Sequence, residues 1–430
     1  MSHDERTSPA DFIYDWNQVG LEQSRPIRHV TLLDETLRDG LQSPSVKNPS
    51  IGDKIRILRL MAELKIEFAD LGLPGAGAGA VRDVTALCEA IRDEKLPVAA
   101  ACAARTLTAD IEPVIAISRD TGVPIELLTF LGASPIRAWA EGWTLESMRH
   151  LVENAVRLGV KAGLPVSFVT EDTVRAHPAV LAELFKVAIH EGATRLVICD
   201  TVGHATPEGV YALFQWVREL TDRLGVEVGL DFHGHNDRGL GLVNSIVALK
   251  AGADRVHATA LGVGERVGNC AMDQLIVNLA LHGVVDRDIS SLSHYCHTVS
   301  AALARPIPPN YPVVGGDAFR TATGVHASAI VKARRKAGAR VANTIYSGVP
   351  SHLVGRDQLI EIGPFSGESN VMAWLSRQDL AQNPTVIAEI LRAAKTSDHT
   401  LADDELRVIV ERCSDGGQDD EALTGPEAQA

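Results

Sequence analysis

Eight short apolar runs, each followed by a longer helix-like segment, alternate along residues 30–281 and restrict the fold more than any other feature of the sequence. The strand-like runs occupy residues 30–33, 68–73, 98–102, 125–131, 166–169, 195–199, 228–232 and 255–260. The helix-like segments occupy residues 51–65, 81–93, 111–119, 145–158, 179–190, 207–224, 240–250 and 272–281. Strands that alternate with helices form parallel sheets, and eight such units in ~250 residues are typical of a closed (β/α)₈ barrel. We therefore predict an α/β protein with a (β/α)₈ TIM barrel, and an open doubly wound sheet is the alternative.

The chain of 430 residues is longer than one barrel requires, and its character changes after the eighth unit. We expect an N-terminal arm at residues 1–27, a catalytic barrel at 28–284, a mostly helical C-terminal region of linker and subdomains at 285–395, and an acidic tail at 396–430. Repeated acidic residues with few large apolar ones are typical of disorder, so the tail is predicted to be disordered.

The charge balance argues against one large class of partner. Lys and Arg number 41 against 55 Asp and Glu, which gives a net charge of −14. A phosphate backbone attracts the opposite sign, so we expect no nucleic-acid partner. The sequence shows no signal-peptide core and no apolar run near the ~20 residues that span a bilayer. The six cysteines form no CxxC pair, and together these features predict a cytoplasmic protein with no membrane partner.

Two histidines lie two residues apart in FHGHND, at the end of the seventh strand-like run. On a strand, residues i and i+2 point to the same face, roughly 6 to 7 Å apart. His233 and His235 can therefore converge on one ion if a third group meets them. A pair of solvated loop histidines is the alternative, and the other strand ends decide between the two.

Polar residues follow the first, fifth, sixth, seventh and eighth predicted strands, at the end of a barrel where active sites form. Asp39 follows strand one, which lies beside strand eight in a closed barrel, so this carboxylate can meet His233 and His235. Such a mixed oxygen and nitrogen set suits a divalent ion: Mg²⁺, Mn²⁺ or Zn²⁺. Asn269 can add an amide oxygen. Arg38 is suited to holding an enolate or carboxylate oxygen beside the ion.

Each of these residues also has a simpler explanation. Asp39 alone is more often a structural residue than a catalytic one, and Glu265 with Arg266 can form a surface ion pair. The glycine-rich segment GAGAGA at 75–80 follows a strand and precedes a helix. Its GxGxGx spacing lacks the pattern of a dinucleotide loop or a P-loop, so we predict a loop near the site rather than a phosphate cradle.

Three ordered motifs resemble a known family. They are LDETLRDG at 33–40, HGHND at 233–237 and GVGERVGN at 262–269. The chain is similar there to the metal-dependent DRE-TIM barrel enzymes that include 2-isopropylmalate synthase, homocitrate synthase and citramalate synthase. The similarity continues through PVVG at 312–315, TGVH at 323–326, residues 346–356 and IGPFSG at 362–367, so it covers about residues 28–375.

The resemblance implies a Claisen condensation. In this family acetyl-CoA is deprotonated and attacks a 2-oxo acid held on the metal, and thioester hydrolysis then releases CoA and a 2-hydroxy diacid. By position, the metal ligands match Asp39, His233 and His235. Arg38 matches the arginine that stabilises the oxyanion, and Glu171 matches the active-site glutamate.

The resemblance also implies a homodimer with shared active sites. In the family, the segment after the barrel lends groups to the neighbouring subunit, and His326 and Tyr346 match the residues implicated there in acid–base chemistry. The pathway implied is amino-acid biosynthesis. The leucine-regulatory domain that ends many isopropylmalate synthases is not expected, because too little chain follows.

Four residues are expected to contact the substrate: Gln42, Arg137, Val169 and Thr201. Thr201 matches the strand-six threonine near the oxo acid, whereas the other positions include departures from the family. Val169 replaces a pocket serine, and Leu41 replaces a glutamate before Gln42. Arg137 replaces a histidine. It either pairs a distal anion of an oxo diacid or lies on the surface, and the sequence leaves both open.

Two other functions remain open. The segment DGLQ at 39–42 also resembles hydroxymethylglutaryl-CoA lyase, although the cysteine-bearing loop of the lyases does not appear at 262–269. A metal-binding barrel without catalysis is the second alternative, supported by Val169 and by the altered stretch RTATGVH at 320–326.

Overall fold

The computed structural model describes residues 12–19, 27 and 30–415. The chain divides into two compact units, Trp16–Ile307 and a second unit of Met1–Asp15 with Pro308–Ala430. Among the described residues, no helix combines the length and the apolarity that crossing a bilayer requires.

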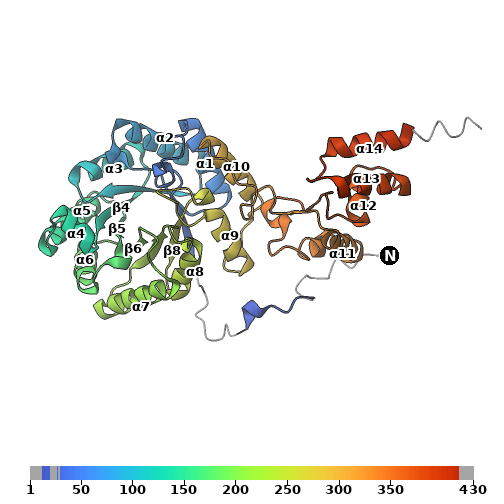
Figure 1. The fold of residues 1–430 in the computed structure, drawn as a ribbon. Coiled ribbons are helices and arrows are strands. Elements are labelled where there is room, and N and C mark those ends of the chain that lie inside the picture. The colour runs from blue at the N-terminus through green and yellow to red at the C-terminus, as the bar shows by residue number, and fades with distance from the viewer. Residues whose placement is uncertain (1–11, 20–26, 28–29, 416–430) are drawn as a thin grey trace, which may run out of the picture. The chain divides into compact units, whose positions relative to one another are not determined.

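The first unit is a closed barrel of eight parallel strands in sequential order, with β1 paired to both β2 and β8 (Figure 1). The strands are β1 (Thr31–Asp34), β2 (Phe68–Asp70), β3 (Ala99–Arg105), β4 (Ile125–Gly132), β5 (Val166–Glu171), β6 (Arg195–Asp200), β7 (Gly229–Gly234) and β8 (Arg255–Ala258). Pairing of β1 with β8 closes the sheet. The predicted barrel is therefore confirmed, and the open doubly wound sheet is excluded.

Helices surround the barrel (Figure 1). They are α1 (Ile51–Glu63), α2 (Ala78–Glu94), α3 (Thr108–Thr121), α4 (Pro135–Glu141), α5 (Leu145–Lys161), α6 (Pro178–His190), α7 (Pro207–Leu224), α8 (Gly241–Ala251), α9 (Met272–Leu281) and α10 (Leu292–Ala302). Side-chain oxygens of Thr144 and Thr206 accept hydrogen bonds from backbone N–H groups in the first turns of α5 and α7, as N-caps do. The short helix α4 was not predicted.

Helix α2 begins earlier than the sequence pattern indicates. Pro74–Ala76 form a 3₁₀ turn, and Ala78 already belongs to α2, so the predicted loop at 75–80 is wrong in its second half. Gly77 joins the two pieces with φ +128°, a conformation that side chains rarely adopt. A Cβ atom at Gly75 would lie 2.6 Å from the Asp110 side chain, so this turn packs closely against α3.

The inside of the barrel has an apolar side and a charged side. Leu33, Ala101 and Leu128 form a buried cluster, and Phe68 and Val169 pack against it. Every second residue of a strand points inward, and in β7 and β8 these positions carry ionisable side chains. They are Asp231, His233, Arg255 and His257, all of them buried. Barrel interiors are usually filled with branched apolar residues, so this charged side is unusual.

The second unit is mostly helical. It contains α11 (Gly324–Ala342), α12 (Glu368–Arg377), α13 (Pro384–Thr396), α14 (Asp403–Asp415) and a two-stranded sheet of β9 (Arg320–Thr321) and β10 (Leu359–Ile360). Its core gathers buried residues of α12, α13 and the following segment around Trp374. The mostly helical character predicted for the C-terminal region is thus confirmed.

The prediction of a disordered tail from residue 396 is wrong for α14. Leu406 is buried in the core of the second unit, and Ile409, Val410 and Cys413 pack against the same core. The Trp374 indole N–H donates to Asp403 Oδ1 over 2.8 Å, which fixes the start of the helix. Residues 416–430 of the predicted tail lie outside the described residues, as do residues 1–11 and 20–26 of the predicted arm.

Candidate active site

A cavity of about 300 Å³ opens at the carboxyl ends of the barrel strands. Eight of the residues predicted for the site line it: Arg38, Asp39, Gln42, Val169, Glu171, Thr201, His233 and His235. They come from β5, from β7 and from the segments that follow β1, β6 and β7, because a parallel barrel brings all its strand ends to one face. The remaining wall is largely apolar.

Asp39, His233 and His235 converge at the bottom of this cavity. One ligand atom of each lies within 4.8 Å of the others, and all three residues are buried. Nε2 of His235 lies 3.4 Å from Oδ2 of Asp39, and Nε2 of His233 lies 3.8 Å from the same oxygen. The two imidazoles and the carboxylate therefore face one small space.

Asn269 completes this group from the loop after β8. Its amide Nδ2 donates to Oδ2 of Asp39 over 2.6 Å. Oδ1 of Asn269 and Nδ1 of His235 are buried and have no hydrogen-bond partner among the described residues. A Cβ atom at Gly264 would lie 1.8 Å from Oδ1 of Asn269, so only glycine allows this close approach.

This set of groups fits a divalent metal ion. Burial lowers the pKa of His235 to about 4, so its imidazole is neutral at physiological pH. Burial would raise the pKa of Asp39, but the positive charge of Arg38 outweighs it and holds the pKa below its usual value. Neutral imidazole and ionised carboxylate are the forms that bind metals. Two unpartnered buried polar atoms beside them are what a site built for an ion would show.

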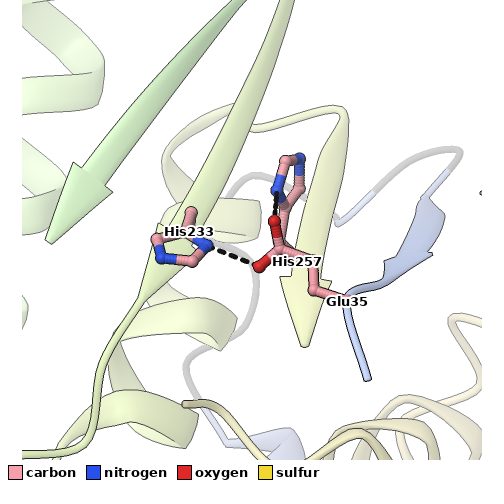
Figure 2. Close-up of side chains that lie close together, drawn as sticks. All are labelled: Glu35, His233 and His257. Carbon is pink, nitrogen blue, oxygen red and sulfur yellow. Dashed lines mark hydrogen bonds and ion pairs between the residues drawn. The ribbon is translucent and has the colours of Figure 1, made fainter. Parts of the chain in front are cut away.

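Glu35 holds His233 from behind (Figure 2). Nδ1 of His233 lies 2.6 Å from Oε2 of Glu35, and Nδ1 of His257 lies 3.1 Å from Oε1. Burial opposes ionisation of Glu35, yet Arg38 and the two histidines hold its pKa well below the usual value. The ionised carboxylate accepts from Nδ1 of His233, which leaves Nε2 of that ring for the metal site.

Arg38 faces three carboxylates at the edge of the cavity. Its Nε donates to Asp70 Oδ2 over 2.8 Å, its Nη2 donates to Glu35 Oε1 over 2.5 Å, and its Nη1 lies 3.4 Å from Asp39 Oδ1. Burial would lower the pKa of Arg38, but the three negative charges raise it well above the usual value. The guanidinium is therefore permanently charged and fixed in orientation beside the candidate metal ligand Asp39.

Glu171 lies on the opposite wall, at the end of β5. Burial raises the pKa of its carboxyl group, and the positive charge of Arg137 opposes that change. Oε1 of Glu171 lies 3.8 Å from Nε of Arg137, which also pairs with Glu141 over 3.2 Å. Arg137 belongs to α4, has 45% of its side chain exposed, and is not among the described residues that line the cavity.

His326 and Tyr346 lie in the second unit. Their rings stack with centroids 4.0 Å apart and an interplanar angle of 28°. The structure thus brings these two predicted residues together with each other. Their action in a partner subunit's site stays a prediction.

A family model described as HMGL-like matches residues 29–299, which is the barrel with α10. The chain belongs to the HMGL-like family. Among its relatives are enzymes of the DRE-TIM type. A 2-isopropylmalate synthase of Pyrococcus abyssi is 32% identical over 72% of this chain, and the chain spans 63% of that protein's length. A 2-isopropylmalate synthase of Nitratidesulfovibrio vulgaris is 30% identical over 89% of this chain and 73% of its own.

Further comparisons support the HMGL-like assignment. A Methanopyrus kandleri protein, provisionally named (R)-citramalate synthase, is 30% identical over 90% of this chain and 73% of its own. The HMG-CoA lyase of Bacillus subtilis is similar in structure, with a TM-score of 0.54 and 19% identity over 66% of this chain and 96% of the lyase. At this identity the likeness to the lyase concerns the fold alone.

The structure places three further ionisable side chains in contact with the candidate site residues, and the sequence analysis did not identify them. They are Glu35, Asp70 and His257. Two of them carried a usable signal, because Asp70 and His257 are charged or polar residues inside otherwise apolar strands. Glu35 directly follows β1, where the sequence alone does not show whether a side chain points into the barrel or toward the helices.

Proposed function

We propose that this chain is an acyltransferase that condenses acetyl-CoA with a 2-oxo acid on a divalent metal and then hydrolyses the thioester to a 2-hydroxy diacid and CoA. One observation carries the proposal. Asp39, His233 and His235 converge beside the fixed guanidinium of Arg38, at the bottom of a cavity large enough for a small acid. Mg²⁺, Mn²⁺ and Zn²⁺ all accept such a donor set.

The comparisons favour a synthase over a lyase. The Nitratidesulfovibrio vulgaris synthase is similar over 397 residues, which takes in most of both units. The Bacillus subtilis lyase corresponds to 66% of the chain. Residues from 308 onward form a compact unit with its own core. A lyase that consists of the barrel alone has no segment that corresponds to this unit.

Four residues of the site have a defined task in this reaction. A bound divalent ion would polarise the carbonyl of the oxo acid as a Lewis acid. Arg38 offers N–H groups to the oxygen on which negative charge develops when the acetyl group becomes an enolate. Glu171, with its raised pKa, is suited to move a proton at the cavity wall. Asn269 and Glu35 hold Asp39 and His233 in place.

The cavity wall points to a 2-oxo acid with an apolar side chain. Its apolar lining comes from Leu73, Ala103, Leu128, Phe130, Val169, Val197 and Cys199. The two arginines that line the cavity are already ion-paired, Arg38 as described and Arg266 with Asp237 over 2.8 Å. Arg137, the residue suggested for a distal anion, is engaged with glutamates outside the lining. A second carboxylate on the substrate would lack a free cation.

We further propose a homodimer in which His326 and Tyr346 serve the partner's cavity in acid–base chemistry. The stacked arrangement of the two rings supports a joint role. Amino-acid biosynthesis is the pathway class that the relatives' names suggest.

The test is release of free CoA thiol from acetyl-CoA with a panel of 2-oxo acids, with and without a chelator. We expect release only with an oxo acid and a divalent metal, fastest with apolar side chains, and loss of release in His233→Ala. The matched control is His190→Ala, on the outside of the barrel. Carbon–carbon cleavage of a CoA ester in place of condensation would identify a lyase. Metal binding with no thiol release from any oxo acid would identify a barrel without catalysis.

A further inference from the structure

Glu35 makes more contacts than holding His233 alone requires. Its carboxylate is 1% exposed and touches three different groups. Oε1 accepts from Nη2 of Arg38 over 2.5 Å. The same oxygen lies 3.1 Å from Nδ1 of His257, and Oε2 lies 2.6 Å from Nδ1 of His233 (Figure 2). One buried carboxylate thus contacts both the oxyanion arginine and a metal-ligating imidazole.

His257 supports Glu35 from the inside of the barrel. Its two ring nitrogens face two carboxylates, with Nδ1 3.1 Å from Glu35 and Nε2 3.1 Å from Asp231. Carboxylates only accept hydrogen bonds when ionised, so both nitrogens must donate and the ring is an imidazolium. A neutral histidine would leave one carboxylate facing a lone pair. Burial would lower the pKa of His257, but Glu35 and Asp231 outweigh it and raise the pKa.

The chain of contacts continues to the other end of the barrel. Asp231 accepts from Arg255 Nε over 2.6 Å, and the guanidinium of Arg255 also donates to Glu126 over 2.8 Å. Arg255 is fully buried. Since cations and anions alternate along this chain, each charge is compensated. Arg38, Glu35 and His257 are the members that line the cavity.

We infer that Glu35 is a positioning residue that orients the metal ligand His233 and the guanidinium of Arg38 as one unit, with His257 as its fixed support. The inference rests on the proposed function for the roles of His233 and Arg38. Its physical basis is that one rigid carboxylate fixes the orientation of two side chains, His233 and Arg38. Nδ1 of His233 is occupied, so Nε2 must face Asp39. Nη2 of Arg38 is occupied, so Nη1 points toward Asp39 and Gln42, both of which line the cavity.

A neutral amide at position 35 would disturb the orientation of both His233 and Arg38. Glutamine has one acceptor oxygen and one donor nitrogen, whereas all three partners of Glu35 are donors. The amide nitrogen of the glutamine would therefore face the N–H group of one of these partners. Loss of a carboxylate that orients a metal-ligating histidine lowers metal affinity about 10- to 100-fold.

The test is Mn²⁺ binding to metal-free full-length protein, measured by calorimetry in wild type and in Glu35→Gln. We expect Mn²⁺ affinity to fall about 10- to 100-fold in Glu35→Gln. At saturating Mn²⁺ we expect kcat for thiol release to remain reduced with KM for the oxo acid little changed, because Arg38 has lost its fixed orientation. His257→Asn keeps Glu35 but removes its support, and we expect a smaller loss of Mn²⁺ affinity.

Two control variants separate positioning from general stability. Val256→Ala removes buried atoms from β8 on the face opposite His257, so it destabilises the barrel without touching the charged chain. Glu191→Gln repeats the chemical change at a pair with Arg157 on the outer helices. Mn²⁺ affinity within twofold of wild type in Glu35→Gln and His257→Asn overturns the inference. Equal loss of Mn²⁺ affinity in Val256→Ala at matched stability overturns it too. Failure of thiol release with every oxo acid would leave the Mn²⁺ result readable and would refute only the proposed function.

Discussion

Asn269 donates its amide N–H to Oδ2 of Asp39 over 2.6 Å, and this bond joins the loop after β8 to the loop after β1 across the closing seam of the barrel. We predict that Asn269→Ala lowers Mn²⁺ affinity about 10- to 100-fold, because Asp39 loses the donor that orients it. Calorimetric titration of metal-free protein checks this. Asn278→Ala on α9 is the matched control, and equal affinities in both variants would contradict the prediction.

Arg38→Gln should lower kcat for thiol release by about 10² to 10³, the effect of losing one donor to a developing oxyanion. The expected KM for the oxo acid changes less, since the ion and the apolar wall still bind it. Steady-state thiol release measures both constants. Arg59→Gln removes an exposed arginine paired with Glu94 on the outer helices and should leave kcat unchanged.

Phe130→Ala should shift the preference among apolar 2-oxo acids toward longer side chains. Phe130 points into the cavity from β4, and one methylene in an apolar pocket changes kcat/KM about tenfold or more. The ratio of kcat/KM for a longer and a shorter oxo acid is the quantity to compare. Thr129→Ala alters the neighbouring position that faces the helices, and a shift there equal to that of Phe130→Ala would show that the wall does not select the substrate.

Asp34 gives the protein a pH-dependent stability that can be isolated. Burial raises its pKa to about 6, although hydrogen bonds from Thr36 and Tyr295 oppose the change. The native state therefore holds this proton more tightly than the unfolded state, for which the pKa is about 3.8. The contribution of this proton to the free energy of unfolding is complete below pH ~4 and is lost as the pH rises through 6. The loss amounts to about 3 kcal/mol.

The measurement is urea unfolding of wild type and Asp34→Asn between pH 4.5 and 7.5. The difference in the free energy of unfolding should shift in favour of Asp34→Asn as the pH rises, because asparagine has no proton to lose. Parallel pH profiles for the two proteins would contradict the assigned pKa.

Mixed dimers test the shared active site. Asp39→Ala and His326→Ala should each be inactive alone, and a mixture refolded together should recover thiol release. In a mixed dimer, the barrel with intact Asp39 receives His326 from the other chain, so one of its two sites is complete. Recovery should fail for two different barrel variants, Asp39→Ala with His233→Ala, because neither barrel is then complete. No recovery in the first mixture would assign His326 a role within its own chain or none at the site.

The sequence predicts the barrel well because strand and helix periods are local and repeat eight times. It also predicts which strand ends form the cavity, since closure of the barrel follows from the number of strand–helix units. Asp39 and His233 are far apart in the chain, yet the order of strands one, eight and seven makes them neighbours. The site could be anticipated because topology, rather than side-chain detail, brings these residues together.

The parts that were missed depend on packing. Leu406, Ile409, Val410 and Cys413 have the i, i+3, i+4, i+7 spacing of a buried helix face, and the surrounding acidic residues concealed it. Helix α4 is shorter than a periodic pattern can reveal. The partners of Glu35 come from β7, β8 and the β1 loop, and only the register of those strands sets their distances.

The alternating charges inside the barrel also constrain how its sequence can drift. Removing one member, such as Arg255 or Asp231, leaves its buried partner charge unpaired and lowers the free energy of unfolding by about 3–5 kcal/mol. This loss is a large share of the stability of a typical domain. Substitutions at these buried positions must therefore occur together, so that each buried charge keeps a partner of opposite charge. Residues on the outer helices can change one at a time. Related barrels should divide into discrete lineages by the identity of positions 35, 231, 255 and 257 taken together.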